Sequence, residues 1–141
     1  MKTPQYTLKN CKNVAVVGLS NKPERPSHAV ARYLQQHGFK IVPVNPTYTG
    51  QEILGEKVCA TLHEAADVLA ATGQRIDVVD CFRKAEEMPA VAREAIAVRA
   101  ACLWMQIGVG NQVAADLASA AGLDVVMDQC MKAEHAAMAA A

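Results

Sequence analysis

Five short apolar segments, separated by stretches with helical spacing, constrain the fold of this chain more than any other feature. They occupy residues 14–17, 41–44, 76–81, 101–107 and 123–127. None of them alternates cleanly between apolar and polar residues, which is typical of strands that are covered on both faces. The sequence therefore predicts about five strands in one sheet that lies between two layers of other structure.

The stretches between these segments show the apolar spacing of helices. This spacing recurs in residues 30–37, 88–96 and 114–121, and a shorter helix is predicted at 61–71. Asn111 and Gly122 suit the start and the stop of the 114–121 pattern, and Asp128 can cap a last helix. Strands that alternate with helices require right-handed crossovers and a parallel sheet. The predicted fold class is α/β, with a single Rossmann-like, doubly wound parallel sheet of about five strands and helices on both faces.

Length and charge indicate the number of domains and the kinds of partner that the chain can bind. Its 141 residues suit one domain, with an N-terminal extension at 1–12, the sheet domain at 13–138 and a tail at 139–141. The 14 basic residues balance the 14 acidic ones, which argues against a nucleic-acid surface built on bulk charge. No apolar run reaches the roughly 18 residues of a membrane span. We expect neither nucleic acid nor a membrane as a partner.

The cysteine pattern indicates the redox state of the cellular compartment in which the chain folds. Five cysteines, at positions 11, 59, 81, 102 and 130, form no C-x-x-C pair and no zinc-like spacing. An odd number of scattered cysteines fits reduced thiols in a reducing compartment. We expect a cytoplasmic protein without a metal site.

The loop after the first apolar segment has the features of an anion site. Gly18 allows a tight turn and a close approach of the backbone, and the loop leads directly into the first helical pattern. The free N–H groups and the positive dipole end of a helix favour an anion there. Lys22, Arg25 and Ser27 add donors beside the loop, and Arg83 follows the third apolar segment. An anionic nucleotide is the ligand that this arrangement favours.

The same loop lacks the marks of a common dinucleotide enzyme. A G-x-G-x-x-G motif would need glycine where Ser20 and Pro23 stand. The second apolar segment ends in Val44-Asn45-Pro46, without the carboxylate that holds ribose hydroxyls in such enzymes. Because no acidic side chain repels it at that point, a phosphorylated ribose can be accepted.

Several motifs taken together resemble those of a known family. They are Gly18-Leu19-Ser20, Arg25-Pro26-Ser27, Val44-Asn45-Pro46, Ile53-Leu54-Gly55-Glu56, Asp80-Cys81-Phe82-Arg83, residues 103–108 and residues 127–135. In these motifs the chain is similar to the small stand-alone CoA-binding proteins, which resemble the CoA-binding domain of the succinyl-CoA synthetase alpha subunit. The resemblance covers residues 13–135. It implies a Rossmann-like fold that holds the ADP part of coenzyme A, or of an acyl-CoA, across the carboxyl ends of the strands.

The resemblance also implies a set of binding residues. Gly18, Leu19 and Ser20 would contact the pyrophosphate, with Lys22, Arg25 and Ser27 nearby; Val44, Asn45 and Pro46 would flank the adenosine; Cys81, Phe82 and Arg83 would form the opposite wall; and Gly108 completes the set. The ligase relatives often have lysine after V-N-P, where this chain has Thr47. A bound 3′-phosphate would therefore need Lys22 or Arg25 as its positive partner.

Some of these residues have a second interpretation that the sequence leaves open. Arg83 could be a solvated loop charge, and Phe82 could close the core instead of facing a ligand. Tyr48 could cover the site as a flap or belong to an ordinary exposed loop. Trp104, in the middle of an apolar segment, is more typical of a core residue.

Two chemical alternatives concern cysteines. Cys81 could exchange with the thiol of CoA if it were exposed in positive surroundings. Cys130, Glu134 and His135 could hold a metal ion, although the same spacing equally serves packing, capping or a subunit contact.

The function expected from these residues is the binding of coenzyme A or acyl-CoA through its ADP moiety, without catalysis. No histidine lies in a recognisable nucleophile or metal constellation, and the second domain that the ligase reaction requires is not expected here. One alternative is an NAD(P)-binding oxidoreductase or redox sensor. Another is an interaction subunit of a CoA ligase or acetyltransferase, and the sequence leaves open a homodimer or a larger enzyme as partner.

Overall fold

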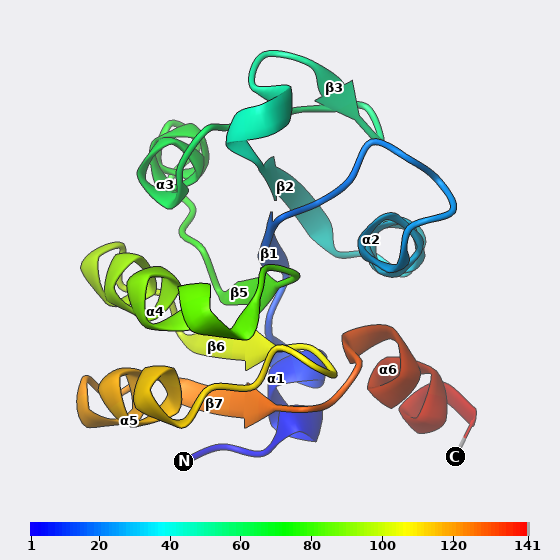
Figure 1. Cartoon of the computed structure of the whole chain (residues 1–141). Coiled ribbons are helices and arrows are strands. Elements are labelled where there is room, and N and C mark those ends of the chain that lie inside the picture. Colours follow the sequence, from blue (N-terminus) through cyan, green and yellow to red (C-terminus); the bar gives the residue numbers. More distant parts are fainter. Residues whose placement is uncertain (141) are drawn as a thin grey trace.

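The computed structural model describes residues 1–140, and its centre is a parallel sheet of five strands (Figure 1). The strands are β1 (Asn13–Val17), β2 (Lys40–Val44), β5 (Val78–Cys81), β6 (Cys102–Met105) and β7 (Asp124–Met127). Each coincides with one of the five predicted apolar segments, and the ends differ by at most a few residues. The predicted α/β fold with a Rossmann-like sheet is confirmed.

The strand order β2-β1-β5-β6-β7 explains where a ligand can bind. The chain leaves β1 toward β2 on one side and later returns to β5 on the other side of β1. In open parallel sheets such a reversal creates a crevice outside the carboxyl ends of the strands. Here that point lies between β1 and β5, where Val17 pairs with Cys81.

Helices cover both faces of the sheet, as the sequence predicts (Figure 1). One layer consists of α3 (Leu62–Ala70), α4 (Met88–Ala97) and α5 (Gln112–Ala120), and the other of α1 (Pro4–Asn10), α2 (Pro26–Gln36) and α6 (Met131–Ala140). Each layer buries its own apolar cluster against the strands. We call the two sides the α4 face and the α2 face.

The predicted helix ends are partly confirmed. Asn111 is the N-cap of α5, since its Oδ1 accepts a hydrogen bond from the backbone N–H of Ala114 at 3.0 Å. Gly122 follows the helix with φ +92°, as expected of a C-terminal stop. Asp128 is not the cap of the last helix, because α6 begins only at Met131. Asp128 instead occupies a left-handed turn with φ +60°.

The amino-terminal segment contains a helix that the apolar pattern did not indicate. Thr3 caps α1 by accepting a hydrogen bond from the N–H of Tyr6 at 3.1 Å, and Leu8 is buried in the core of the α2 face. A helix of seven residues is too short for a recognisable period. At the other end, α6 extends to Ala140, so residues 139 and 140 of the expected tail are helical, and residue 141 lies outside the described residues.

Short elements between β2 and α3 were also missed. A 3₁₀ turn, η1 (Pro46–Tyr48), is followed by a hairpin of β3 (Glu52–Ile53) and β4 (Glu56–Lys57). Its two turn residues, Leu54 and Gly55, both have positive φ, as a tight hairpin with right-handed twist requires. Strands of two residues carry no periodicity. Among residues 1–140 no helix is long and apolar enough to cross a bilayer.

Candidate functional site

The turn after β1 is built around a close contact at Gly18. Its φ of +86° is one that side-chain-bearing residues rarely adopt. A Cβ atom at this position would lie 2.8 Å from the carbonyl oxygen of Phe82 and 2.9 Å from Cδ of Arg83. The segment after β5 therefore packs directly on the backbone of Gly18, at the point where the chain reversal opens the crevice.

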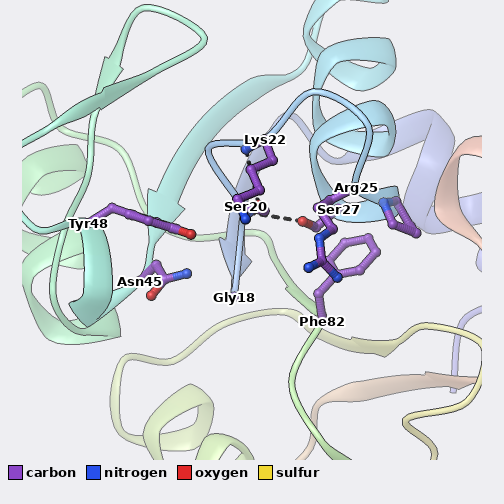
Figure 2. Close-up of a pocket in the computed structure, with 9 residues that line it drawn as sticks. Gly18, Ser20, Lys22, Arg25, Ser27, Asn45, Tyr48 and Phe82 are labelled. Carbon is purple, nitrogen blue, oxygen red and sulfur yellow. Dashed lines mark hydrogen bonds between the residues drawn. The ribbon is translucent and has the colours of Figure 1, made fainter.

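Two serine hydroxyls shape the loop between β1 and α2 (Figure 2). The backbone N–H of Ser20 donates to Oγ of Ser27 at 3.0 Å, and the N–H of Lys22 donates to Oγ of Ser20 at 3.1 Å. In both contacts the hydroxyl oxygen is the acceptor. Each hydroxyl therefore keeps its own proton to donate to a ligand.

The start of α2 adds a second feature that favours an anion. Arg25 occupies the N-cap position without a hydrogen bond from its side chain to the helix, and Pro26 follows at the first helical position. The first N–H groups of a helix need partners outside it, and the helix dipole makes this end positive. A phosphate group satisfies both requirements.

These features line a pocket of about 380 Å³, which we call the α2 pocket (Figure 2). Its lining residues are Gly18, Ser20, Lys22, Arg25, Pro26, Ser27, Asn45, Tyr48 and Phe82. The two cations, Lys22 and Arg25, are exposed, and the ion pairs among residues 1–140 do not involve them. No acidic side chain is among the lining residues. The pocket is thus locally positive in a chain whose net charge is zero.

Asn45 joins the end of β2 to the loop after β1. Its Nδ2 donates to the carbonyl oxygen of Leu19 at 3.1 Å, and its Oδ1 accepts from the N–H of Thr47 at 3.0 Å. The side chain is 8% exposed, so these contacts are shielded from water. Asn45 therefore holds the floor of the α2 pocket in place. Tyr48, at the end of η1, lines the same pocket and is half-buried.

A second pocket lies at the same edge of the sheet. We call this cavity of about 620 Å³ the α4 pocket. It is lined by Val17, Val44, Pro46, Ala60, Thr61, Arg83, Glu86, Glu87, Ala90, Val91, Arg93 and Glu94. Val17 and Gly18 are consecutive, as are Phe82 and Arg83, yet the members of each pair line different pockets. The two pockets therefore flank the carboxyl ends of β1 and β5.

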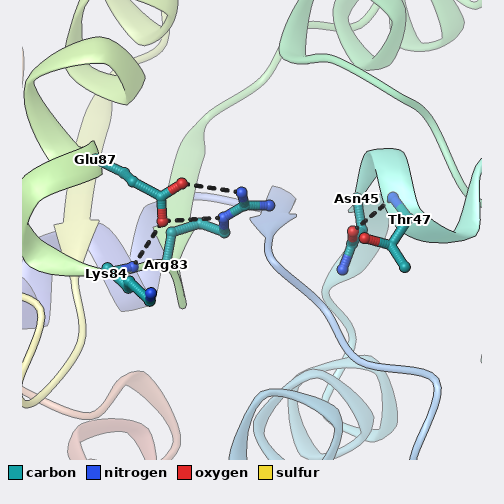
Figure 3. Close-up of polar contacts among 5 residues, drawn as sticks. All are labelled: Asn45, Thr47, Arg83, Lys84 and Glu87. Carbon is teal, nitrogen blue, oxygen red and sulfur yellow. Dashed lines mark hydrogen bonds and ion pairs between the residues drawn. The ribbon is translucent and has the colours of Figure 1, made fainter.

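Arg83 is held within the α4 pocket by an ion pair (Figure 3). Its guanidinium donates to both carboxylate oxygens of Glu87, at 3.0 and 3.4 Å. The hydrogen bond from Arg83 lowers the pKa of Glu87. Figure 3 shows the guanidinium pointing across the end of β1 toward the side where Asn45 and Thr47 lie. Arg83 is therefore neither a free solvated charge nor a member of the α2 pocket.

The thirteen residues expected from the sequence fall into three groups. Seven line the α2 pocket: Gly18, Ser20, Lys22, Arg25, Ser27, Asn45 and Phe82. Val44, Pro46 and Arg83 line the α4 pocket. Leu19, Cys81 and Gly108 line neither of them. The side chain of Leu19 is buried in the core, and its carbonyl oxygen accepts the hydrogen bond from Asn45, whereas Gly108 is exposed in the loop after β6.

The geometry supports neither chemical alternative for the cysteines. Cys81 is fully buried, and desolvation raises its pKa well above the ordinary value, so it offers no accessible thiolate for exchange. No three His, Cys, Asp or Glu side chains of residues 1–140 are placed to hold a metal ion. Nδ1 of His135 instead lies 2.9 Å from the hydroxyl of Tyr33. Trp104 is fully buried in the core, as predicted.

Several lining residues were absent from the expected set. Pro26 and Tyr48 in the α2 pocket adjoin residues that the motifs did indicate. The α4-pocket residues on α4, such as Ala90 and Arg93, come together with Val44 and Pro46 at the end of β2 only in the folded chain. This contact between distant segments leaves no motif in the sequence.

Comparison with known proteins finds relatives that match this chain over nearly its whole length. A protein of Bacillus subtilis, the uncharacterized protein YneT, is 40% identical over 129 residues, which cover 92% of this chain and 89% of that protein. A solved structure from Thermus thermophilus is 31% identical with a TM-score of 0.86, and covers 97% of this chain and 99% of its own. A hypothetical protein from Pyrococcus horikoshii is 34% identical with the same TM-score, covering 98% and 93% respectively.

The family itself follows from the pattern of residues across the chain. The model of one protein family, described as the CoA binding domain, matches residues 12–136. That range includes every strand of the sheet and both pockets. The chain belongs to the CoA-binding domain family.

Proposed function

We propose that this protein binds coenzyme A or an acyl-CoA through its ADP moiety and performs no catalysis of its own. The observation that carries the proposal is the α2 pocket, where Lys22 and Arg25 lie beside two serine hydroxyls and the start of α2. A pyrophosphate supplies the negative charge and the acceptor oxygens that these donors need. Membership of the CoA-binding domain family supports the same ligand.

In this proposal the phosphates and the adenosine of the ligand occupy different pockets, according to the charge and polarity of each pocket. The phosphates occupy the α2 pocket, where the cations have no carboxylate partner among residues 1–140. The adenosine lies across the end of β2 and reaches the α4 pocket, where Val44 and Pro46 offer apolar contacts. Lys22 or Arg25 is the partner of the 3′-phosphate, because the charge of Arg83 is offset by Glu87.

The proposal that the protein performs no catalysis is supported by the lining of the α2 pocket. Its titratable side chains are Lys22, Arg25 and Tyr48. None of the described hydrogen bonds connects one of them to a side chain that could act as a general base. A nucleophile and an adjacent base are the usual requirement for acyl transfer.

Thermal unfolding in the presence of nucleotides tests the proposal. We expect CoA to raise the melting temperature with increasing concentration, dephospho-CoA to do so less, and NADH and NADPH to have no effect. Arg25→Ala and Ser20→Ala should weaken the response to CoA, whereas the exposed His63→Ala should not. Equal stabilisation by CoA and dephospho-CoA would refute the 3′-phosphate contact, and a response to NADH alone would favour an oxidoreductase or redox sensor.

Compartment and partners belong to the same proposal. We place the protein in the cytoplasm, because its five cysteines are all free thiols. A small-molecule nucleotide is the proposed partner. Co-purification of the full chain with a larger CoA ligase or acetyltransferase would instead support a role as an interaction subunit.

A further inference from the structure

A buried carboxyl group lies on β5, two residues before Phe82 of the α2 pocket. Asp80 is 0% exposed and pairs in register with Val16 on β1 and Trp104 on β6, two residues of the α2-face core. Its Oδ1 accepts a hydrogen bond from Nε2 of Gln106 at 2.5 Å. Its Oδ2 is buried and has no hydrogen-bond partner among the described residues. Half of the carboxylate is therefore without the polar contacts that a buried charge requires.

Among residues 1–140, no charged side chain compensates the carboxyl group of Asp80. The titratable groups that act on it, or on which it acts, are the thiols of Cys81 on the same strand and Cys102 on β6. Burial raises the pKa of both thiols, that of Cys102 to about 12, so both are neutral at physiological pH. Within residues 1–140, Lys, Arg and His side chains contribute nothing to the pKa of Asp80. Burial therefore raises that pKa to about 7.

The position of Asp80 links it to the ligand. It lies two residues before Phe82, whose side chain lines the α2 pocket, and a strand advances about 3.3 Å per residue, so the separation is roughly 7 Å. Gln106, its only partner among the described residues, directly precedes the exposed Ile107 and Gly108 at the end of β6. Because Asp80 is 0% exposed, nearby charges act on it more strongly than they would in water.

We propose that Asp80 takes up a proton from solvent when an anionic ligand enters the α2 pocket, so that ligand binding weakens as pH rises. The inference rests on the proposed function. A bound pyrophosphate adds negative charge close to Asp80 and disfavours its ionised form. The proton is held on the carboxyl group, with Oδ2 as the oxygen that has no other partner among residues 1–140, while Gln106 remains the positioning residue at Oδ1.

The sign of the effect follows from linkage. The anionic ligand binds more tightly to the protein whose Asp80 is protonated, so its presence moves the pKa of Asp80 above about 7. Between the unliganded and liganded pKa values, binding takes up protons. The affinity for CoA is expected to fall by about threefold to tenfold as pH rises from about 6 to about 8.5.

Calorimetric titration of the full chain with CoA tests the inference. Titrations at about pH 7.5 in two buffers of different ionisation enthalpy measure the protons taken up on binding. The 3′-phosphate of CoA itself titrates near pH 6 and contributes a background, which Asp80→Asn shares. We expect wild type to take up a measurable fraction of a proton more than Asp80→Asn. Equal uptake in the two proteins would overturn the inference.

A second variant keeps the test decisive if Asp80→Asn does not fold. Gln106→Leu removes the hydrogen bond that lowers the pKa of Asp80, so the pH at which CoA affinity declines should move upward. An unchanged pH profile in Gln106→Leu would overturn the inference. If wild type shows no binding of CoA at any pH, the proposed function itself fails, which is a different result from binding without excess proton uptake.

Discussion

The α2 face and the α4 face cover the same five strands, but they differ where those strands end. On the α2 face, Lys22 and Arg25 lie in a pocket that no carboxylate lines, and Asp80 is buried in register with two core residues of that face. On the α4 face, Arg83 is neutralised by Glu87 in a larger and more apolar cavity. The strand order thus places both pockets at one edge of the sheet, and the pairing of charges leaves the unpaired cations on one side of it.

The largest expected effect concerns the buried carboxyl of the α2 face. The pKa of Asp80 in the folded chain is about 7, compared with an ordinary value of 3.8. The folded state therefore binds more protons than the unfolded state between these values, and stability is lost as pH rises through this window. The loss is about 4 kcal/mol at about 1.4 kcal/mol per pKa unit. Urea unfolding from pH 4 to 8 measures it.

The control for this prediction is Asp80→Asn, which removes the titrating group and keeps an acceptor for Gln106. Its free energy of unfolding should vary much less over the same pH range. If the free energy of unfolding fell equally with pH in the two proteins, burial of Asp80 would not cause the loss. The two faces would then differ only in their surface charges.

The next effect concerns the contact that joins the two pockets. Gly18→Ala should lower the free energy of unfolding by about 3 kcal/mol, since it adds a clash with the backbone of Phe82 to a strained φ. Gly108→Ala is the matched control, because Gly108 has a similar φ of +87° but no atom of the described residues lies within 4 Å of the position that a Cβ would take. It should cost only about 1 kcal/mol. Equal losses would show that close approach at Gly18 is unimportant.

Features that leave a local pattern in the sequence could be predicted, both in the fold and in the site, and features without such a pattern could not. The strands and the loop at Gly18 were predictable because buried strands leave apolar runs and a phosphate-sized turn leaves a local motif. Five of the seven motif residues of the α2 pocket lie within residues 18–27, so one stretch of sequence brings most of them together. By contrast, α1 and the β3–β4 hairpin were too short to show a period.

The α4 pocket was harder to predict because packing between distant segments creates it. The sequence placed Arg83 on the wall of a single site, but in the segment after β5 Phe82 lines one pocket and Arg83 the other. Glu87, the ion-pair partner of Arg83, lies four residues further along the chain and belongs to none of the motifs. Likewise, the burial of Asp80 depends on Val16 and Trp104, which meet it only in the assembled sheet.

A matched pair of arginine variants compares the two pockets directly. Arg25→Ala should weaken CoA binding by about 10-fold to 100-fold, the usual loss when a charge-assisted contact to phosphate is removed. Arg83→Ala should weaken it by less than about threefold, because Glu87 already offsets the charge of Arg83. Isothermal titration at constant ionic strength measures both. The opposite ranking would place the phosphates in the α4 pocket.

The smallest expected effect concerns how α6 completes the α2 face. The hydroxyl of Tyr33 on α2 lies 2.9 Å from Nδ1 of His135 on α6, so Tyr33→Phe should lower the free energy of unfolding at pH 8 by about 1 kcal/mol. Burial, reinforced by His37, lowers the pKa of His135, and the resulting cost of charging it reduces stability as pH falls below about 6.5. Tyr6→Phe, on the exposed side of α1, is the control for urea unfolding. If both variants lost equal stability, the Tyr33–His135 contact would not hold α6 against α2, and the α2 face would depend on apolar packing as the α4 face does.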